Sequence, residues 1–132
     1  MIQITREYLE RLTTVDFSRD MALVAVLMLD GREVLIGVAR YVLEEKGSAM
    51  LEADGRACEF ALVVADAWQG HGIGRRMLEK LIAVARGRGL EKIYGEVLST
   101  NHHMLDFCRK LGFALGRNPD DATVTRVTLQ LN

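Results

Sequence analysis

The chain of 132 residues lacks the features that mark several specialised classes of protein. Its two cysteines are far apart, and neither lies in a Cys-x-x-Cys or Cys/His spacing that would indicate zinc. A net charge of −1 lacks the basic excess of a general nucleic-acid binder. No apolar run approaches the ~20 residues of a membrane-spanning helix, and residues 1–7 lack the apolar segment of a secretion signal. These absences predict a cytoplasmic protein without a metal and without nucleic-acid or membrane partners.

The composition that is present is that of one globular domain. Hydrophobic residues make up 49% of the chain and charged residues 27%, and the length suffices for one core but not for two. Cys58 and Cys108 stand in apolar surroundings and are interpreted as buried thiols. His102 and His103 are adjacent on a predicted helix, where neighbouring side chains point in different directions, so they make a poor metal pair. We expect residues 1–132 to form a single domain.

Apolar runs predict five strands, over residues 21–29, 34–43, 57–64, 91–98 and 123–131. The first run is nearly continuous in apolar residues, which predicts a strand buried on both faces. Asp30-Gly31 predicts a hairpin, and Gly37 in the return strand indicates a bulge or a close approach of another chain segment. Residues 44–56 are expected to form an acidic loop, which could attract a cationic substrate or could simply be solvated.

Helical spacing is present in three segments. Thr5 can cap a short helix that carries Leu9, Leu12 and Val15. A longer helix is expected to begin near Gly74 and to end at a left-handed Gly89. Its apolar stripe comprises Met77, Leu78, Leu81, Ile82 and Ala85. A third helix follows a cap at residue 101 and ends at residues 112–113 in the same way. The order helix, hairpin, strand, helix, strand, helix, strand predicts a mixed α/β sandwich.

A glycine-rich stretch lies between the third strand and the long helix, and it reads Trp68-Gln69-Gly70-His71-Gly72-Ile73-Gly74-Arg75-Arg76. Three glycines there leave N–H groups uncovered where the helix dipole is positive, which favours a pyrophosphate. The spacing fits neither a Walker loop nor G-x-G-x-x-G, because arginines follow Gly74. A turn that merely reverses the chain is the alternative. The spacing that does fit is Q-x-x-G-x-G, from Gln69 through Gly72 to Gly74.

This motif resembles the R/Q-x-x-G-x-G/A loop of the GNAT superfamily of N-acetyltransferases, which binds the pyrophosphate of acetyl-CoA. Residues 101–113 resemble the second signature of that family, N-x-x-x-x-x-x-Y-x-x-x-G-F, because Asn101, Gly112 and Phe113 match in spacing. The resemblance extends from about Asp16 to the end of the chain. It implies an α/β GNAT fold, in which a mixed, mostly antiparallel sheet splays apart at the acetyl-CoA site and is flanked by helices.

The resemblance also implies which residues bind acetyl-CoA. The backbone of residues 62–64 would bond the pantetheine arm, one N–H would polarise the thioester carbonyl, and the three side chains would serve the core. His71 and Arg75 or Arg76 are candidate phosphate ligands, with exposed and solvated side chains as the alternative. Trp68 is expected to support the loop from the core. The predicted coenzyme-binding set is Leu62, Val63, Val64, Gln69, Gly70, His71, Gly72, Ile73, Gly74, Arg75 and Asn101.

Glu59 lies between Cys58 and Phe60 in the strand before the loop. A carboxylate in such surroundings is costly unless it is exposed or used chemically, so a solvent-facing residue and a general base are both open. An amine with a pKa of about 10.4 must lose a proton before it attacks, and burial would raise the pKa of Glu59 toward a useful range. The resemblance implies an acidic base at this strand position. Glu59 is the first candidate and Glu96, on the next strand, is the reserve.

Cys108 occupies the position at which many GNAT members have a tyrosine that protonates the departing CoA thiolate. A thiol with an ordinary pKa near 8.5 could donate that proton, which makes Cys108 a candidate general acid. A buried structural cysteine is the alternative, with water as the proton donor.

Within the superfamily the chain is most similar to the acetyltransferase domains of bacterial protein lysine acetyltransferases, which modify acyl-CoA synthetases. The segments that carry this similarity are 15–17, 21–25, 37–41, 59–61, 68–70, 96–98, Asn101 and Met104. Such domains usually begin with an additional strand and helix, so the chain is expected to be a fragment of a longer protein. Only Ile2-Gln3-Ile4 could replace the first strand. The edge of residues 21–29 would then need cover from the N-terminus or from a second copy in a homodimer.

The sequence therefore predicts transfer of the acetyl group of acetyl-CoA to a primary amine by direct attack in a ternary complex. A protein lysine, such as one on an acyl-CoA synthetase, is the first candidate acceptor. Two rivals share the same glycine loop. One is a non-catalytic acyl-CoA-sensing module, which does not need Glu59, and the other is an acetyltransferase of small amines or antibiotics, which differs only in its acceptor cleft.

Overall fold

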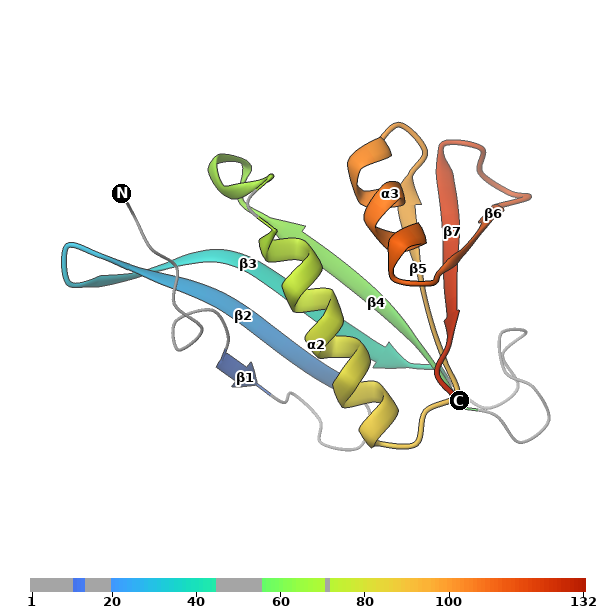
Figure 1. Cartoon of the computed structure of the whole chain (residues 1–132), viewed down its shortest axis with the longest axis horizontal. Coiled ribbons are helices and arrows are strands. Elements are labelled where there is room, and N and C mark those ends of the chain that lie inside the picture. The colour runs from blue at the N-terminus through green and yellow to red at the C-terminus, as the bar shows by residue number, and fades with distance from the viewer. Residues whose placement is uncertain (1–10, 14–19, 45–55, 71) are drawn as a thin grey trace. The chain divides into compact units, whose positions relative to one another are not determined.

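The computed structural model describes residues 11–13, 20–44, 56–70 and 72–132 (Figure 1). These residues divide between two compact units. The first unit comprises Met1–Val42 and Ala61–Leu81, and the second comprises Leu43–Phe60 and Ile82–Asn132. The strands are β1 (Arg11–Thr13), β2 (Asp20–Leu29), β3 (Arg32–Leu43), β4 (Ala57–Val64), β5 (Lys92–Leu98), β6 (Ala114–Arg117) and β7 (Val124–Gln130). The helices are η1 (Asp66–Trp68), α2 (Ile73–Gly87) and α3 (His102–Lys110).

In the first unit the strand order is β1-β2-β3-β4, and the predicted hairpin joins β2 to β3. Asp30 and Gly31 both have positive φ, of 50° and 76°, which is the geometry of a tight hairpin turn. Along β2 the side chains alternate between buried and half-buried, with Met21, Leu23, Ala25 and Leu27 at 1% exposure or less. The prediction of burial on both faces was therefore wrong for one face of β2, which is only half-covered.

Gly37 shows both of the features that its position in the strand predicted. The β2–β3 register shifts between Ala25 and Val26, so that Ile36 is an extra residue beside Gly37. A Cβ on Gly37 would lie 2.7 Å from Met77 Cε and 3.2 Å from the carbonyl oxygen of Val63. The first turns of α2 therefore pack on β3 where the bulge bends that strand.

The N-terminal prediction needs a correction. Arg11–Thr13 form β1, which pairs antiparallel with residues 22–24 of β2, and not part of a helix. Backbone pairing along a sheet edge satisfies N–H and C=O groups that a short amphipathic helix would leave unpaired on that edge, and it overrides the helical spacing of residues 9, 12 and 15. The edge of β2 is covered by this chain over those three residues. The remaining residues of the predicted helix and the connector 16–19 lie outside the described residues.

In the second unit the strand order is β4-β5-β7-β6. β4 and β5 run parallel and pair only from Ala57↔Lys92 to Glu59↔Tyr94, whereas β5 and β7 pair antiparallel over seven residues. The short β6 was not predicted, because Leu115 is its only half-buried residue and its apolar signal is correspondingly weak. The sheet is mixed and mostly antiparallel, as predicted.

Both helices end as their glycines predicted. At the end of α2 the backbone N–H of Leu90 donates to the carbonyl oxygen of Ala85, and that of Gly89 donates to the carbonyl oxygen of Arg86. At the end of α3 the N–H of Phe113 donates to the carbonyl oxygen of Cys108, and that of Gly112 donates to the carbonyl oxygen of Arg109. Gly89 and Gly112 have φ of 78° and 102°, which completes two Schellman caps. The apolar stripe of α2 is buried, with Met77, Leu78, Leu81, Ile82 and Ala85 at 6% exposure or less. Among the described residues, no helix combines the length and apolarity that crossing a membrane requires.

Candidate functional site

The glycine loop connects η1 to α2 in the first unit, and two of its glycines adopt left-handed backbone conformations. Gly70 has φ of 84° and Gly72 has φ of 78°, and apart from the chain neighbours no atom of the described residues lies within 4 Å of a Cβ built on either. L-residues with side chains rarely adopt such angles, so glycine is required here by the backbone rather than by crowding. His71 lies outside the described residues.

The amides of this loop meet the condition for binding an anion. Among the described residues, none accepts a backbone hydrogen bond from the N–H groups of Gly70, Gly72, Ile73 or Gly74. The first backbone bond at the start of α2 is from Arg76 N to the Gly72 carbonyl oxygen, at 3.1 Å. N–H groups that have no backbone acceptor among the described residues, at the positive end of a 15-residue helix, are suited to phosphate oxygens.

Side chains fix this loop against the end of β4. Gln69 Nε2 donates to the carbonyl oxygen of Val64 at 3.1 Å and to Asp66 Oδ1 at 3.2 Å, and Ala65 N donates to the Ile36 carbonyl oxygen at 2.8 Å. Trp68 is half-buried in η1, where no residue is buried, so the prediction that it supports the loop from the core was wrong. Gln69 therefore links the loop to the end of β4 by hydrogen bonds.

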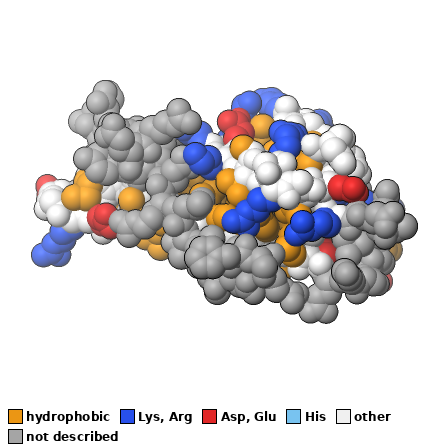
Figure 2. Space-filling model, turned by 90° about the horizontal axis from the view of Figure 1, so that it is seen from below, with side chains coloured by type: hydrophobic (Ala, Val, Ile, Leu, Met, Phe, Trp, Pro, Cys, Tyr) orange, Lys and Arg blue, Asp and Glu red, His pale blue; other side chains and the backbone are white. Residues whose placement is uncertain are grey.

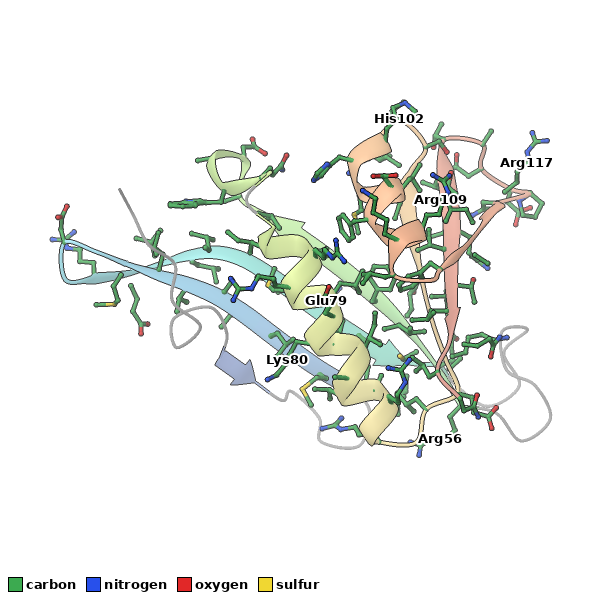
Figure 3. The ribbon with its side chains drawn as sticks, viewed as in Figure 1. Arg56, Glu79, Lys80, His102, Arg109 and Arg117 are labelled. Carbon is green, nitrogen blue, oxygen red and sulfur yellow. The ribbon has the colours of Figure 1, made fainter. Side chains whose placement is uncertain are left out.

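The other predicted coenzyme residues of this unit lie on β4 and on α2. Val63 is 66% exposed and Leu62 and Val64 are half-buried, so the prediction that all three side chains serve the core was wrong. The exposed Arg75 donates through Nε to Glu79 Oε1 at 2.9 Å, and Glu79 lies one turn along α2 (Figure 3). Arg76 is exposed.

In the second unit Glu59 lies on the exposed side of β4, between the buried Cys58 and Phe60. Loss of hydration raises the pKa of Glu59 above its ordinary value, and the negative charges of Glu44 and Glu96 raise it further, whereas Arg126 lowers it. The direction agrees with the shift that the sequence predicted. A carboxylate that is easier to protonate than usual is chemically suited to accept a proton.

Glu96 is held differently. Its Oε1 accepts from Arg126 Nε at 3.0 Å, from Arg126 Nη2 and from Asn118 Nδ2 at 3.3 Å. The Arg126 guanidinium also lies over the Tyr94 ring, 5.5 Å from its centre. Sequence reasoning missed Arg126, Asn118 and Tyr94, because only the β5–β7 register brings residues 30 positions apart together. Glu96 thus has a fixed orientation and a committed oxygen.

The two residues singled out on and beside α3 have clear structural roles. Asn101 Oδ1 accepts from Met104 N at 3.1 Å and so caps the helix, as predicted. Cys108 is fully buried, and burial raises the pKa of its thiol to about 11, as it raises that of Cys58 to about 12. A thiol with that pKa gives up its proton less readily than an ordinary one, which favours the structural alternative for Cys108.

Across the described residues, no group of three or more His, Cys, Asp or Glu side chains could hold a metal ion. His102 begins α3 and Arg109 lies near its end (Figure 3). On the face shown in Figure 2, Lys and Arg side chains are interspersed with Asp and Glu.

Residues 3–113 match the family model described as the acetyltransferase (GNAT) family. A curated relative, acetyltransferase PA5475 of Pseudomonas aeruginosa, is 36% identical over 115 residues, which cover 87% of this chain and 58% of the relative. N-alpha-acetyltransferase 80 of Mus musculus is 36% identical over 63% of this chain and 23% of its own length. The chain thus spans little more than half the length of the first relative.

Solved structures with the same arrangement include three at or above one-quarter identity. The GNAT domain of S. lividans PAT has a TM-score of 0.67 at 28% identity, over 89% of this chain and 64% of that one. The cAMP-binding acyltransferase from Mycobacterium smegmatis has a TM-score of 0.66 at 25% identity, over 89% of this chain and 33% of that one. The acetyltransferase yncA from Salmonella typhimurium, solved with acetyl-CoA, has a TM-score of 0.62 at 26% identity, over 86% of this chain and 65% of that one.

Proposed function

The chain belongs to the acetyltransferase (GNAT) family, and from that premise we propose that it transfers the acetyl group of acetyl-CoA to a primary amine, in the first place a protein lysine. The observation that carries the proposal is the glycine loop, whose left-handed Gly70 and Gly72 precede a helix whose first amides have no backbone acceptor in the described part of the chain. A pyrophosphate fits those amides better than any neutral ligand does. The same Q-x-x-G-x-G spacing holds the coenzyme in the family.

The proposed coenzyme contacts follow from the backbone of the first unit. The amides of residues 70–74 hold the pyrophosphate, and Gln69 keeps their direction fixed through its bonds to Val64 and Asp66. The backbone of residues 62–64 meets the pantetheine arm. Arg75 is partly occupied by Glu79, so its contribution to phosphate binding is secondary.

In the proposed reaction Glu59 takes a proton from the acceptor ammonium, directly or through a water molecule. The neutral amine nitrogen then forms a bond to the acetyl carbon, and the carbon–sulfur bond of the thioester breaks. The thiolate of CoA leaves with its electron pair and is protonated by solvent, because the buried Cys108 thiol is a weak acid. As the amide forms, the attacking nitrogen loses its second proton to solvent, which balances the proton that the thiolate takes up, and the protonated Glu59 returns its own proton to solvent. A neutralising base is needed because an amine with a pKa of about 10.4 is almost fully protonated near pH 7.

A cationic acceptor fits the charges around the proposed base. Two carboxylates, those of Glu44 and Glu96, act on Glu59, and Arg126 is the single cation named with them. An excess of negative charge attracts an ammonium and holds it close to the base. The similarity to bacterial protein lysine acetyltransferases makes a lysine on an acyl-CoA synthetase the first acceptor to test.

Two other functions share the glycine loop. One is a non-catalytic acyl-CoA-sensing module, which would bind the coenzyme without needing Glu59. A small-amine acetyltransferase would differ only in its acceptor cleft. The three functions differ in whether the acetyl group is transferred after acetyl-CoA binds, and in which acceptor receives it.

The decisive experiment incubates the chain with acetyl-CoA and, in parallel, acyl-CoA synthetases, lysine peptides, polyamines and amino acids. CoA release is followed continuously, and mass spectrometry locates the transferred acetyl group. We expect release that depends on a lysine-containing protein, with a mass increase of one acetyl group on a lysine. Tight binding of acetyl-CoA without transfer to any acceptor would favour the sensing module. Transfer to polyamines or amino acids alone would favour the small-amine enzyme, and no binding at all would overturn the proposal.

A further inference from the structure

The Glu96–Arg126 ion pair is fixed more firmly than a surface pair. Both Nε and Nη2 of Arg126 donate to the same Glu96 oxygen, and Asn118 Nδ2 adds a third bond to it. The ring of Tyr94, which is 3% exposed, lies against the guanidinium on another side. The side chains of the pair are 36% and 25% exposed, so solvent screens them less than it screens a surface pair.

The pair lies on the same face of the sheet as Glu59. Tyr94 is the register partner of Glu59 across the parallel β4–β5 pair, and Glu96 follows two residues later on the same face of β5. Arg126 is the register partner of Glu96 on β7, so its side chain is on that face as well. Glu44 lies beside the start of β4, because its N–H donates to the Ala57 carbonyl oxygen at 2.9 Å. Glu44, Glu96 and Arg126 are the charged groups that act on Glu59.

We propose that the Glu96–Arg126 ion pair is a positioning element for the base: it fixes one negative and one positive charge beside Glu59, and the balance of the two adjusts how readily Glu59 takes the proton of the acceptor amine. The inference rests on the proposed function, because it takes Glu59 to be the base. It gives Glu96 a role other than that of a reserve base. The oxygen of Glu96 that accepts three hydrogen bonds is committed to holding Arg126.

The pair predicts an opposite response to the loss of its two members. Glu96 favours the protonated form of Glu59 and Arg126 favours the ionised form, so removing either leaves the other uncompensated. General loss of packing around Tyr94 would instead move Glu59 in the same direction in both variants. Removing both charges together leaves the net charge unchanged and should largely restore the original titration of Glu59.

The experiment follows the titration of Glu59 by NMR of its carbon-13-labelled carboxyl group, in the whole chain and without acetyl-CoA. Glu96→Gln is expected to lower the midpoint by about half a pH unit, and Arg126→Gln to raise it by a similar amount. The Glu59 midpoint of the double variant should differ from that of the original chain by only a small fraction of that shift. The acid limb of the pH profile of kcat/KM with acetyl-CoA and an acceptor should move in the same directions.

A matched control uses the exposed Asp106–Lys110 pair on α3, whose atoms are 3.0 Å apart. Asp106→Asn and Lys110→Gln make the same changes of charge and should leave the Glu59 midpoint in place. If Arg126→Gln does not fold, Arg126→Lys keeps the charge and should move the midpoint less than Glu96→Gln does. Equal directions in the two single variants, or no movement in either, would overturn the inference. Because the NMR titration needs no turnover, absence of acetyl transfer would count against the proposed function alone.

Discussion

The proposed function has two halves, coenzyme binding and base catalysis, and each uses a different part of the polypeptide. In the first unit the coenzyme loop offers backbone amides, and its glycines are needed for their φ angles. In the second unit the reactive chemistry depends on side chains, with Glu59 among Glu44, Glu96 and Arg126. The comparison teaches that a binding site made of backbone can be recognised by glycine spacing, whereas a site made of side chains depends on which strands become neighbours. Changes in one half should therefore alter binding, and changes in the other should alter turnover.

The largest effect should come from Glu59→Gln, which removes the base and leaves the loop untouched. We expect kcat to fall by about 10² to 10⁴ while the affinity for acetyl-CoA stays the same. Wild-type activity should rise with pH through the raised pKa of Glu59, since only the ionised form accepts a proton. The rate of CoA release across pH, with coenzyme affinity by calorimetry, checks both expectations.

The same substitution has a stability signature. A carboxyl whose pKa is raised on folding stabilises the folded chain while it is protonated, and that stability is lost as the pH rises through the folded pKa. At neutral pH the ionised Glu59 thus opposes folding, and Glu59→Gln should not lower the Tm. Glu33→Gln, an exposed change on the β2–β3 hairpin, is the matched control and should leave the rate unchanged. An unchanged rate across pH in Glu59→Gln would remove Glu59 as the base.

The next effect concerns the packing behind the base. A Cβ on Gly95 would lie 2.6 Å from the Phe60 ring, which also makes an edge contact with Phe113 at 5.7 Å between centres. Gly95→Ala should therefore cost about 1 to 3 kcal/mol in the free energy of unfolding. Denaturant unfolding measures the loss, and adding Phe60→Leu should recover part of it. Gly87→Ala, at the end of α2 with open space around its Cβ, should instead stabilise the chain slightly. If Gly95→Ala unfolds with the same free energy as the original chain, the Phe60 ring moves aside at no cost.

A smaller effect is expected in the binding half. Gly72→Ala places a Cβ at φ of 78°, a conformation that costs an L-residue about 1 to 2 kcal/mol, so the loop amides should lose their direction. Acetyl-CoA should bind about tenfold more weakly, with kcat at saturation nearly unchanged. Isothermal calorimetry checks the affinity, and Gly116→Ala on β6 is the control, because Gly116 has neither positive φ nor crowding. If Gly72→Ala binds as tightly as the original chain, the loop amides are not the coenzyme site.

The smallest effect on turnover should come from Cys108→Ala. The buried thiol has its pKa raised to about 11, so it is a poor proton donor to a departing thiolate, and kcat should stay within about twofold. Stability should fall by about 1 kcal/mol, because a buried sulfur is removed. Initial rates and thermal melts measure the two quantities. A tenfold loss of kcat, with a shifted alkaline limb of the pH profile, would instead make Cys108 the general acid.

Much of the fold follows from local sequence signals. Asp30-Gly31 specifies the hairpin, Gly89 and Gly112 specify the ends of both helices, and the bounds of β4 are those predicted. The failures have a common cause. β1 and β6 are short strands whose pairing partners, and not their own periodicity, determine their structure. The exposure of Val63 likewise depends on what covers β4, which an apolar run cannot report.

The sequence by itself determined the family, the glycine loop and the identity of Glu59 as the leading candidate for the base, because these depend on residue type and on spacing along the chain. Only the tertiary structure decided that Arg126 binds Glu96, that Asn118 supports the pair and that Cys108 is fully enclosed. The reason is physical: hydrogen bonds across strands, and the charges that shift a pKa, depend on distances in space between residues far apart in the chain, 30 positions for Glu96 and Arg126 and more for Glu59 and Arg126. Glycine conformations and helix caps depend on neighbours within a few residues, so they can be predicted from the local sequence.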